Sequence, residues 1–234
     1  MFRFKQFNVD QTGCAMKINT DGVLLGALAG AGNPKTILDI GTGTGVIALM
    51  LAQRFPEAII DGVEIDEKAA KTAKNNFANS PFADRLTLYG DSFERFFEDN
   101  PDRRYDLIIS NPPFYINSLK SPGAGKQLAK HADDGFFESL LTGVAEHLSE
   151  DGLLWLILPI ETAELVEALA AKMGLHLQDV IEIRSFVDSA PHRQILTFGL
   201  SQTILCGSEL VIYDEPKLYS MQYRAALTYF FTIF

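Results

Sequence analysis

Short apolar runs alternate with amphipathic stretches through the first half of the chain. The runs read TILDI (36–40), AIIDGVEI (58–65), RLTLYG (85–90) and YDLIIS (105–110). Between them lie stretches with helical periodicity, VIALMLAQRF, EKAAKTAKNNF and SFERFFED. Continuous apolar strands separated by amphipathic helices predict a parallel sheet covered on both faces. In such a sheet the ligand lies at the carboxyl ends of the strands.

The second half continues the same pattern. From Gly135 onward we expect a helix over FFESLLTGVAEHL, a buried strand over GLLWLILP and a helix over ETAELVEALAAKM. Gly152 and Pro159 bracket the strand, and SEDG is expected to form the turn before it. Two more strands are expected around 177–187 and 194–202. The tail YSMQYRAALTYFFTIF is expected to be a helix whose aromatic side chains pack in the core.

Composition narrows the class of protein. The chain has 234 residues, 47% of them hydrophobic, and no apolar run reaches the about 18 residues of a membrane span. The start, MFRFKQFNVD, lacks the apolar core of a signal peptide. We therefore expect one soluble, cytoplasmic domain over 1–234, with an N-terminal extension over 1–35 and a core over 36–234. Cys14 and Cys206 have no neighbours at metal-ligand spacing, so neither a disulfide nor a metal is expected.

Net charge is −10, which by itself argues against a nucleic-acid partner. The charge is unevenly spread, because residues 1–38 carry a net charge of +2 and residues 111–132 carry +3. The second segment holds Lys120, Lys126 and Lys130 and no carboxylate. These lysines are candidates to contact phosphate, and a solvated face explains them equally well.

Three glycines, Gly41, Gly43 and Gly45, separate the first strand from the first helix in LDIGTGTGVIALML. Residues without a Cβ let a ligand touch the backbone. A dinucleotide fingerprint has the spacing G-x-G-x-x-G, and Val46 stands where its helix-packing glycine belongs. The loop therefore favours a nucleoside-like ligand without a pyrophosphate over a nicotinamide cofactor.

Carboxylates end the next two strands. Glu64 in VEID can accept both hydroxyls of a ribose, and Asp91 in GDSF can accept the exocyclic N–H of adenine. Taken singly, such residues also serve as helix N-caps, and a glycine-rich turn is often only a turn. Together, at successive strand ends, they favour a nucleoside-binding edge.

This arrangement resembles the class I S-adenosylmethionine-dependent methyltransferases. The resemblance implies an α/β, Rossmann-like fold, a mostly parallel seven-stranded sheet and S-adenosylmethionine as cofactor. It also implies that Asp39 lies under the glycine loop near the methionine end of the cofactor. The alternative role of Asp39 is to hold the amides of the loop itself.

The fourth strand ends in SNPPFY, residues 110–115. NPPF resembles the (N/D)PP(Y/F) signature of methyltransferases that modify amino or amide nitrogens. The lone pair of such a nitrogen is delocalised, so the nitrogen must be oriented and its developing positive charge stabilised. The side-chain oxygen of Asn111 and the carbonyl of Pro112 can each accept one N–H, and Phe114 offers a ring for a flipped base. Alone, Asn-Pro-Pro is also simply a good turn.

The rest of the chain is similar to the small bacterial tRNA methyltransferases that modify N6 of adenosine 37 in a valine tRNA. FRFKQFNVDQTGCAMKINTDGVLLGALA, PHRQILTF and the closing YS..Y..AL..FF carry this resemblance. The chain departs from the family pattern at Phe114, where tyrosine is common in that family. It implies tRNA as the partner, no membrane and no metal.

The same resemblance implies that Lys17, Thr20 and Asp21 lie beside the cofactor pocket. A helix N-cap formed by Thr20 or Asp21 is the alternative. Arg193 either faces RNA or solvates a strand end. For the whole protein, the alternatives are an N-methyltransferase of a protein glutamine or an rRNA base, and a non-catalytic S-adenosylmethionine-binding protein.

Overall fold

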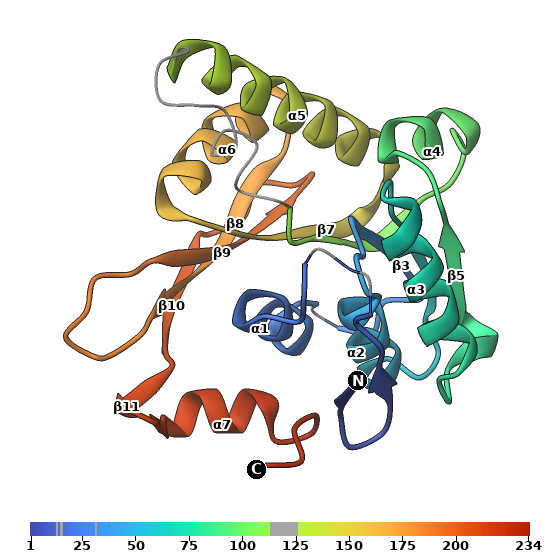
Figure 1. Ribbon diagram of the computed structural model, residues 1–234. Helices are drawn as coiled ribbons and strands as arrows, with labels where there is room; N and C mark the ends of the chain where they lie inside the picture. Colours follow the sequence, from blue (N-terminus) through green and yellow to red (C-terminus); the bar gives the residue numbers. More distant parts are fainter. Residues whose placement is uncertain (13, 15, 31, 113–125) are drawn as a thin grey trace.

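The strands of the chain assemble into one central sheet (Figure 1). The computed structural model describes the backbone of residues 1–12, 14, 16–30, 32–112 and 126–234, and the side chains of the same residues except 126–134. The sheet has eight strands in the order β10-β8-β9-β7-β6-β3-β4-β5. They are β3 (Thr36–Ile40), β4 (Ile59–Val63), β5 (Leu86–Tyr89), β6 (Tyr105–Ser110), β7 (Leu148–Leu158), β8 (His176–Arg184), β9 (Arg193–Gly199) and β10 (Cys206–Val211).

Strand β9 runs antiparallel to both of its neighbours, β7 and β8, and the other pairings are parallel. The predicted α/β class with a mostly parallel sheet is therefore confirmed. The expected count of seven strands is wrong, because β10 adds an eighth at the edge, parallel to β8. The first four residues of β10 are exposed, so no apolar pattern marks it in the sequence.

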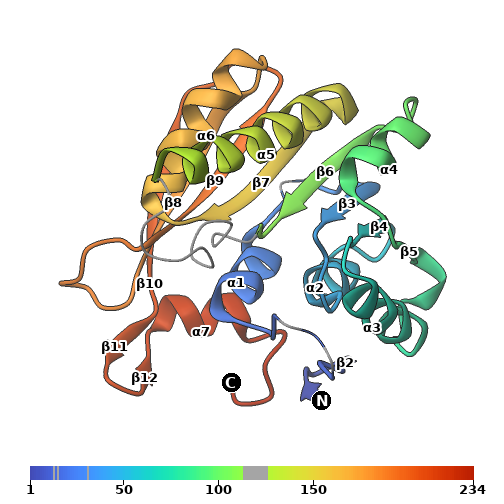
Figure 2. The ribbon, with the colours of Figure 1, turned by 45° about the horizontal axis from the view of Figure 1, so that its top comes forward.

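Helices cover both faces of the sheet (Figures 1 and 2). They are α1 (Thr20–Leu28), α2 (Val46–Arg54), α3 (Glu67–Ala78), α4 (Phe93–Asp99), α5 (Lys126–His147), α6 (Ile160–Lys172) and α7 (Met221–Leu227), with a short 3-10 turn η1 (Ala83–Arg85). The side chains of α1, α2 and α7 form one buried apolar cluster with the N-terminal phenylalanines. Those of α4, α5 and α6 form a second cluster on the opposite face. Within the described residues, no helix combines the length and the apolar character that crossing a bilayer needs.

Two boundaries differ from the predicted ones. Helix α5 already begins at Lys126, ten residues or so before the apolar run that marks it in the sequence. Strand β7 begins at Leu148 and includes SEDG, which was expected to be a turn. A register irregularity explains this, since Tyr105 pairs with Leu148 but Leu107 pairs with Leu153. A Cβ at Gly152 would lie 2.7 Å from the Tyr105 carbonyl oxygen, so this irregular path needs glycine.

The two ends of the chain lie side by side (Figure 1). β1 (Phe2–Arg3) and β2 (Asn8–Val9) form a small hairpin, and β11 (Tyr213–Glu215) pairs with β12 (Leu218–Tyr219). Phe4 bridges to Phe231, and Lys5 Nζ donates to the carbonyl oxygens of Thr228 and Phe234. Tyr223 and Phe230 of the tail are buried in the core as predicted, but Tyr229 is exposed. Helix α7 ends at Leu227, earlier than expected.

Candidate active site

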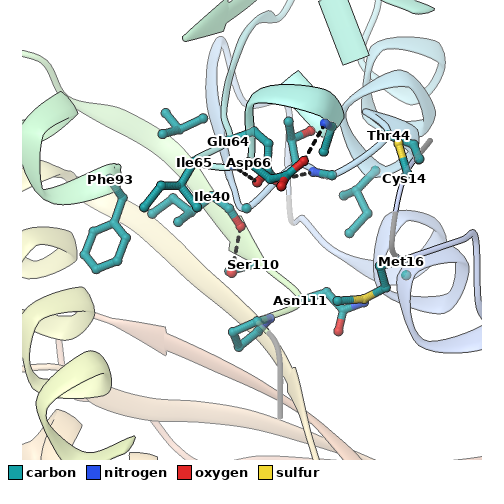
Figure 3. Close-up of a pocket in the computed structure, with 18 of the residues that line it drawn as sticks. Cys14, Met16, Ile40, Thr44, Glu64, Ile65, Asp66, Phe93, Ser110 and Asn111 are labelled. Atoms are coloured by element: carbon teal, nitrogen blue, oxygen red, sulfur yellow. Dashed lines mark hydrogen bonds between the residues drawn. The ribbon is translucent and has the colours of Figure 1, made fainter. Parts of the chain in front are cut away.

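The carboxyl ends of four neighbouring strands meet at one edge of the sheet. Ile40 of β3 pairs with Val63 of β4 and with Ser110 of β6, and Val63 pairs with Tyr89 of β5. The segments that follow these residues therefore leave the sheet at one level. A cavity of about 400 Å³ opens there, which is the size of a small-molecule site. Figure 3 shows Glu64, Ser110 and Asn111 around it, with Phe93 and Cys14 on opposite sides.

Most of the predicted site residues line this cavity. Those that do are Gly41, Gly43, Glu64, Asp91, Asn111 and Pro112, together with Lys17. Five other predicted site residues are described but do not line the cavity: Asp39, Gly45, Thr20, Asp21 and Arg193. Phe114 and Lys120 lie outside the described residues, and the side chains of Lys126 and Lys130, in α5, lie outside them too.

The three loop glycines have different tasks. All three have positive φ, 69° at Gly41, 58° at Gly43 and 82° at Gly45. A Cβ at Gly41 would meet nothing within 4 Å, because this residue borders the cavity. A Cβ at Gly45, the N-cap of α2, would lie 2.5 Å from the ring of Phe77. Gly45 thus lets the start of α2 pack closely against α3, while Val46 still occupies the third position of the dinucleotide fingerprint.

Glu64 ties the second strand end to the glycine loop. Its Oε2 accepts the Gly43 N–H over 2.8 Å, and its Oε1 accepts the Asp66 N–H over 2.8 Å. The residue is buried yet lines the cavity. A carboxylate oxygen has two acceptor directions, so each oxygen can still take a hydroxyl from a ligand.

Asp39 lies behind the loop rather than in the cavity. Its Oδ2 accepts the Thr42 hydroxyl over 2.6 Å and the Ala48 N–H over 3.1 Å, and its Oδ1 meets no described hydrogen-bond partner. Burial disfavours the charged form and raises the pKa of this carboxyl to about 7, with a further contribution from the charge of Glu64. The contacts of Asp39 are those of a residue that holds the loop against α2.

Asp91 follows the end of the third strand and lines the cavity. Its Oδ1 accepts the Ser92 N–H over 2.9 Å, and its Oδ2 lies 3.4 Å from Arg95 Nε. Next to it, Phe93 meets Phe136 edge to face, with ring centroids 5.6 Å apart. Both rings line the cavity, so this end offers an acceptor beside an apolar surface.

The fourth strand end carries Asn111 and Pro112. Ser110 is buried and donates its hydroxyl to the Ile40 carbonyl over 2.8 Å, which fixes the end of β6 against β3. Pro112 is buried and Asn111 is partly exposed to the cavity. Asn111 therefore directly follows a residue that is held in the sheet.

Four residues around Lys17 also line the cavity and were not predicted to do so. Cys14, Met16, Ile18 and Asn19 of the N-terminal segment line it. Asn76 holds this segment in place, because its side chain exchanges hydrogen bonds with the Asp10 backbone and donates to the Thr44 carbonyl over 2.8 Å. A signal was available, since Asn76 is a polar residue on the otherwise apolar buried face of α3.

Thr20, Asp21 and Arg193 lie together beside the cavity. The N-cap of α1 is Asn19, whose side chain accepts the Gly22 N–H over 2.8 Å, so the alternative of an N-cap at Thr20 or Asp21 is wrong. Asp21 Oδ2 instead accepts from Arg193 Nε over 2.8 Å. Over the described part of the chain, no group of three or more His, Cys, Asp or Glu side chains is arranged to hold a metal ion.

Comparison with known proteins identifies the family. Residues 19–176 match the model of the methyltransferase small domain. A tRNA1(Val) (adenine(37)-N6)-methyltransferase of Pedobacter heparinus is 50% identical over 233 residues, covering 100% of this chain and 98% of that protein. The chain belongs to the tRNA1(Val) (adenine(37)-N6)-methyltransferase family. Family members with this name from Bacteroides thetaiotaomicron and Citrobacter koseri are 40% and 39% identical, over 95% and 100% of this chain and 93% and 95% of those proteins.

Solved structures support the methyltransferase fold. A protein named as a predicted O-methyltransferase from Agrobacterium tumefaciens aligns with a TM-score of 0.70 at 18% identity, over 89% of this chain and 96% of that chain. A methyltransferase from Pyrococcus furiosus aligns with a TM-score of 0.55 at 21% identity, over 82% and 91%. At these identities the likeness concerns the fold of this member of the adenine-N6 methyltransferase family and not its substrate.

Proposed function

We propose that the protein transfers a methyl group from S-adenosylmethionine to N6 of adenosine 37 in a valine tRNA. It acts as a single domain over 1–234, in the cytoplasm. One observation carries the proposal: Asn111 and Pro112 line the same cavity as the glycine loop and Glu64. Relatives that match over 95% or more of the chain are named tRNA1(Val) (adenine(37)-N6)-methyltransferases, which supports tRNA as the substrate class.

The cavity fits the cofactor chemically. Gly41 leaves open space where a Cβ would stand, Glu64 presents carboxylate oxygens suited to ribose hydroxyls, and Asp91 presents an acceptor beside Phe93 and Phe136. When bound, S-adenosylmethionine supplies an electrophilic methyl carbon. Asp39 supports this region through its bonds to Thr42 and the Ala48 N–H.

Asn111 and Pro112 prepare the target nitrogen. The Asn111 side-chain oxygen and the Pro112 carbonyl each accept one N–H of the N6 amino group, which leaves its lone pair free for the methyl carbon. Both acceptors gain strength as positive charge develops on nitrogen, so they stabilise the transition state more than the bound substrate. The nitrogen would form a bond to the methyl carbon as the bond between that carbon and sulfur breaks, with S-adenosylhomocysteine as the leaving group. The nitrogen releases one proton to water, and no general base is needed.

The substrate base enters from an unpaired loop. A base in a single-stranded loop leaves its stack at little cost, which suits an enzyme of this size. Phe114 supplies a ring on which the base stacks. Lys120, Lys126 and Lys130 contact phosphates of the tRNA. Neutralising the three together should weaken tRNA binding and flatten its salt dependence, while cofactor affinity is unchanged.

A paired assay tests the proposal. Labelled S-adenosylmethionine is incubated with the protein and either unmodified tRNA, duplex DNA, rRNA or a protein substrate with an exposed glutamine, and the products are digested and identified by mass. N6-methyladenosine at position 37 of the valine tRNA is the expected product. Transfer to DNA, to rRNA, to glutamine or to none of these would contradict the proposal, and binding without transfer would indicate a non-catalytic protein.

A further inference from the structure

The first turn of α1 lies beside Asn111, and both line the cavity. A Cβ built on Gly22 would lie 3.6 Å from Asn111 Nδ2 and 3.3 Å from Asn19 Oδ1. A side-chain atom at this position would already be in van der Waals contact with the amide, so only a narrow space separates α1 from Asn111. Nδ2 is the amide atom nearer to this position, so the amide oxygen on the other branch is directed away from α1.

An ion pair anchors the first turn of α1 to the sheet. Asp21, the residue before Gly22, accepts from Arg193 Nε over 2.8 Å, and the two side chains are only 15% and 23% exposed. Arg193 is the first residue of β9, which is paired on both sides by β7 and β8. The pair thus ties the first turn of a helix to a fully paired strand 172 residues away in the sequence.

Neither member of the pair lines the cavity, whereas Asn19, Gly22 and Asn111 do. A direct contact of Asp21 with a cofactor is therefore not needed to explain an effect of this residue on the reaction. The ion pair instead holds the helix turn that lies beside Asn111.

We propose that Asp21 and Arg193 are positioning residues that set the orientation of Asn111 through Gly22. The inference rests on the proposed function of Asn111 as an acceptor for the target amino group. Since a displacement of about 1 Å at a reacting group can cost about 100-fold in rate, loosening this turn should lower kcat rather than weaken binding.

The test uses the full chain with Asp21→Asn, Arg193→Gln and the double variant. Each single variant should lower kcat for tRNA methylation by about tenfold. The Kd for S-adenosylmethionine, measured by calorimetry, and the KM for tRNA should stay within about twofold of the wild type. The double variant should show no further loss, because both changes break the same link. Arg193→Lys, which keeps the charge, should recover part of the rate.

Gly22→Val tests the narrow space beside Asn111 itself and should lower kcat by about 100-fold. The matched control is Gly26→Ala one turn along α1, where a Cβ would meet Met50 Sδ at 3.0 Å, away from the cavity. This control should lower the melting temperature and leave kcat unchanged. Melting temperatures of all variants separate loss of rate from loss of fold.

Three results would overturn the inference. A weaker Kd for S-adenosylmethionine in Asp21→Asn at unchanged kcat would make Asp21 a cofactor contact. A raised tRNA KM with a flatter salt dependence in Arg193→Gln would make Arg193 an RNA contact. Wild-type kcat in the folded double variant would remove the link altogether. A wild-type protein that forms no N6-methyladenosine would instead contradict the proposed function, so the two failures are distinct.

Discussion

Gly43 donates its backbone N–H to Oε2 of Glu64 over 2.8 Å, so the glycine loop and the acid at the next strand end form one connected unit. The other oxygen of Glu64 accepts the Asp66 N–H at the start of α3. The glycine loop and the start of α3 therefore meet on one carboxylate. Its position is set before any ligand arrives, which lowers the ordering cost of binding.

Glu64→Ala should weaken the binding of S-adenosylmethionine by about 1.5 to 3 kcal/mol, the scale of a hydrogen bond to a charged group. Calorimetry measures this directly. The matched control is Glu67→Ala, an exposed acid in the first turn of α3 that does not line the cavity. Equal affinity in the two variants would remove Glu64 from the cofactor site.

Asn111→Ala should lower kcat by about 10² to 10³ and change the affinity for tRNA and cofactor little. The reason is that the lost acceptor is needed most when charge develops on nitrogen. Single-turnover kinetics with labelled cofactor separates the chemical step from binding. Asn79→Ala, at the exposed C-cap of α3, serves as the control. Full turnover by Asn111→Ala would contradict the assigned role.

Gly45→Ala should destabilise the fold by about 2 to 4 kcal/mol, from a left-handed backbone and a clash with Phe77. Gly174→Ala isolates the first of these effects, because its φ is 76° but a Cβ there would meet nothing within 4 Å. It should cost only about 1 to 2 kcal/mol. Urea denaturation compares the two, and equal costs would show that the contact with Phe77 relaxes freely.

Asp39→Asn should change how stability depends on pH. The folded pKa of Asp39 is raised to about 7 by burial, whereas the unfolded value is about 3.9. The stability that its neutral form contributes is complete below about pH 4, falls as pH rises toward 7 and stays lost above it. The variant should therefore gain on the wild type across this range, by on the order of a few kcal/mol. Denaturation curves at several pH values measure the gain.

Asp106→Asn is a control, because the pKa of Asp106 is shifted in the direction opposite to that of Asp39. Burial acts to raise the pKa of Asp106, but hydrogen bonds from the backbone N–H groups of Lys35 and Thr36 and from the Ser149 hydroxyl outweigh it, so the pKa is lowered. The stability it contributes is present above about pH 4 and is lost as pH falls below that value. Asp106→Asn should therefore cost stability at neutral pH, with a cost that fades in acid. Parallel pH profiles for the two variants would contradict both assignments.

The sheet and its helices could be predicted wherever burial leaves a pattern. TILDI and YDLIIS are buried on both faces, and both form parallel strands where expected. The strand ends then bring Glu64, Asp91 and Asn111 to one cavity, as the parallel topology requires. β10 left no such pattern, because an edge strand is held by its backbone ladder and most of its side chains are exposed.

Long-range contacts account for what sequence reasoning missed at the site. Asp21 could be read as a cap or a ligand contact, and only the fold shows that Arg193 reaches it from β9. Asn76 joins Asp10 and Thr44, three segments with no shared local pattern. A polar side chain on an apolar helix face indicates that some partner exists, but the sequence does not say which one.

The contact between Lys5 and the tail has a consequence for the order of events during synthesis. Lys5 Nζ donates to the carbonyl oxygens of Thr228 and Phe234, 223 and 229 residues further on. The segment after Lys5 continues into the cavity wall at Cys14 and Asn19. While the chain is still on the ribosome, the sheet edge with Glu64 can form, but the hairpin that leads into this wall still lacks its partner. A nascent chain should acquire its full affinity for ligand only when residues 228–234 have emerged.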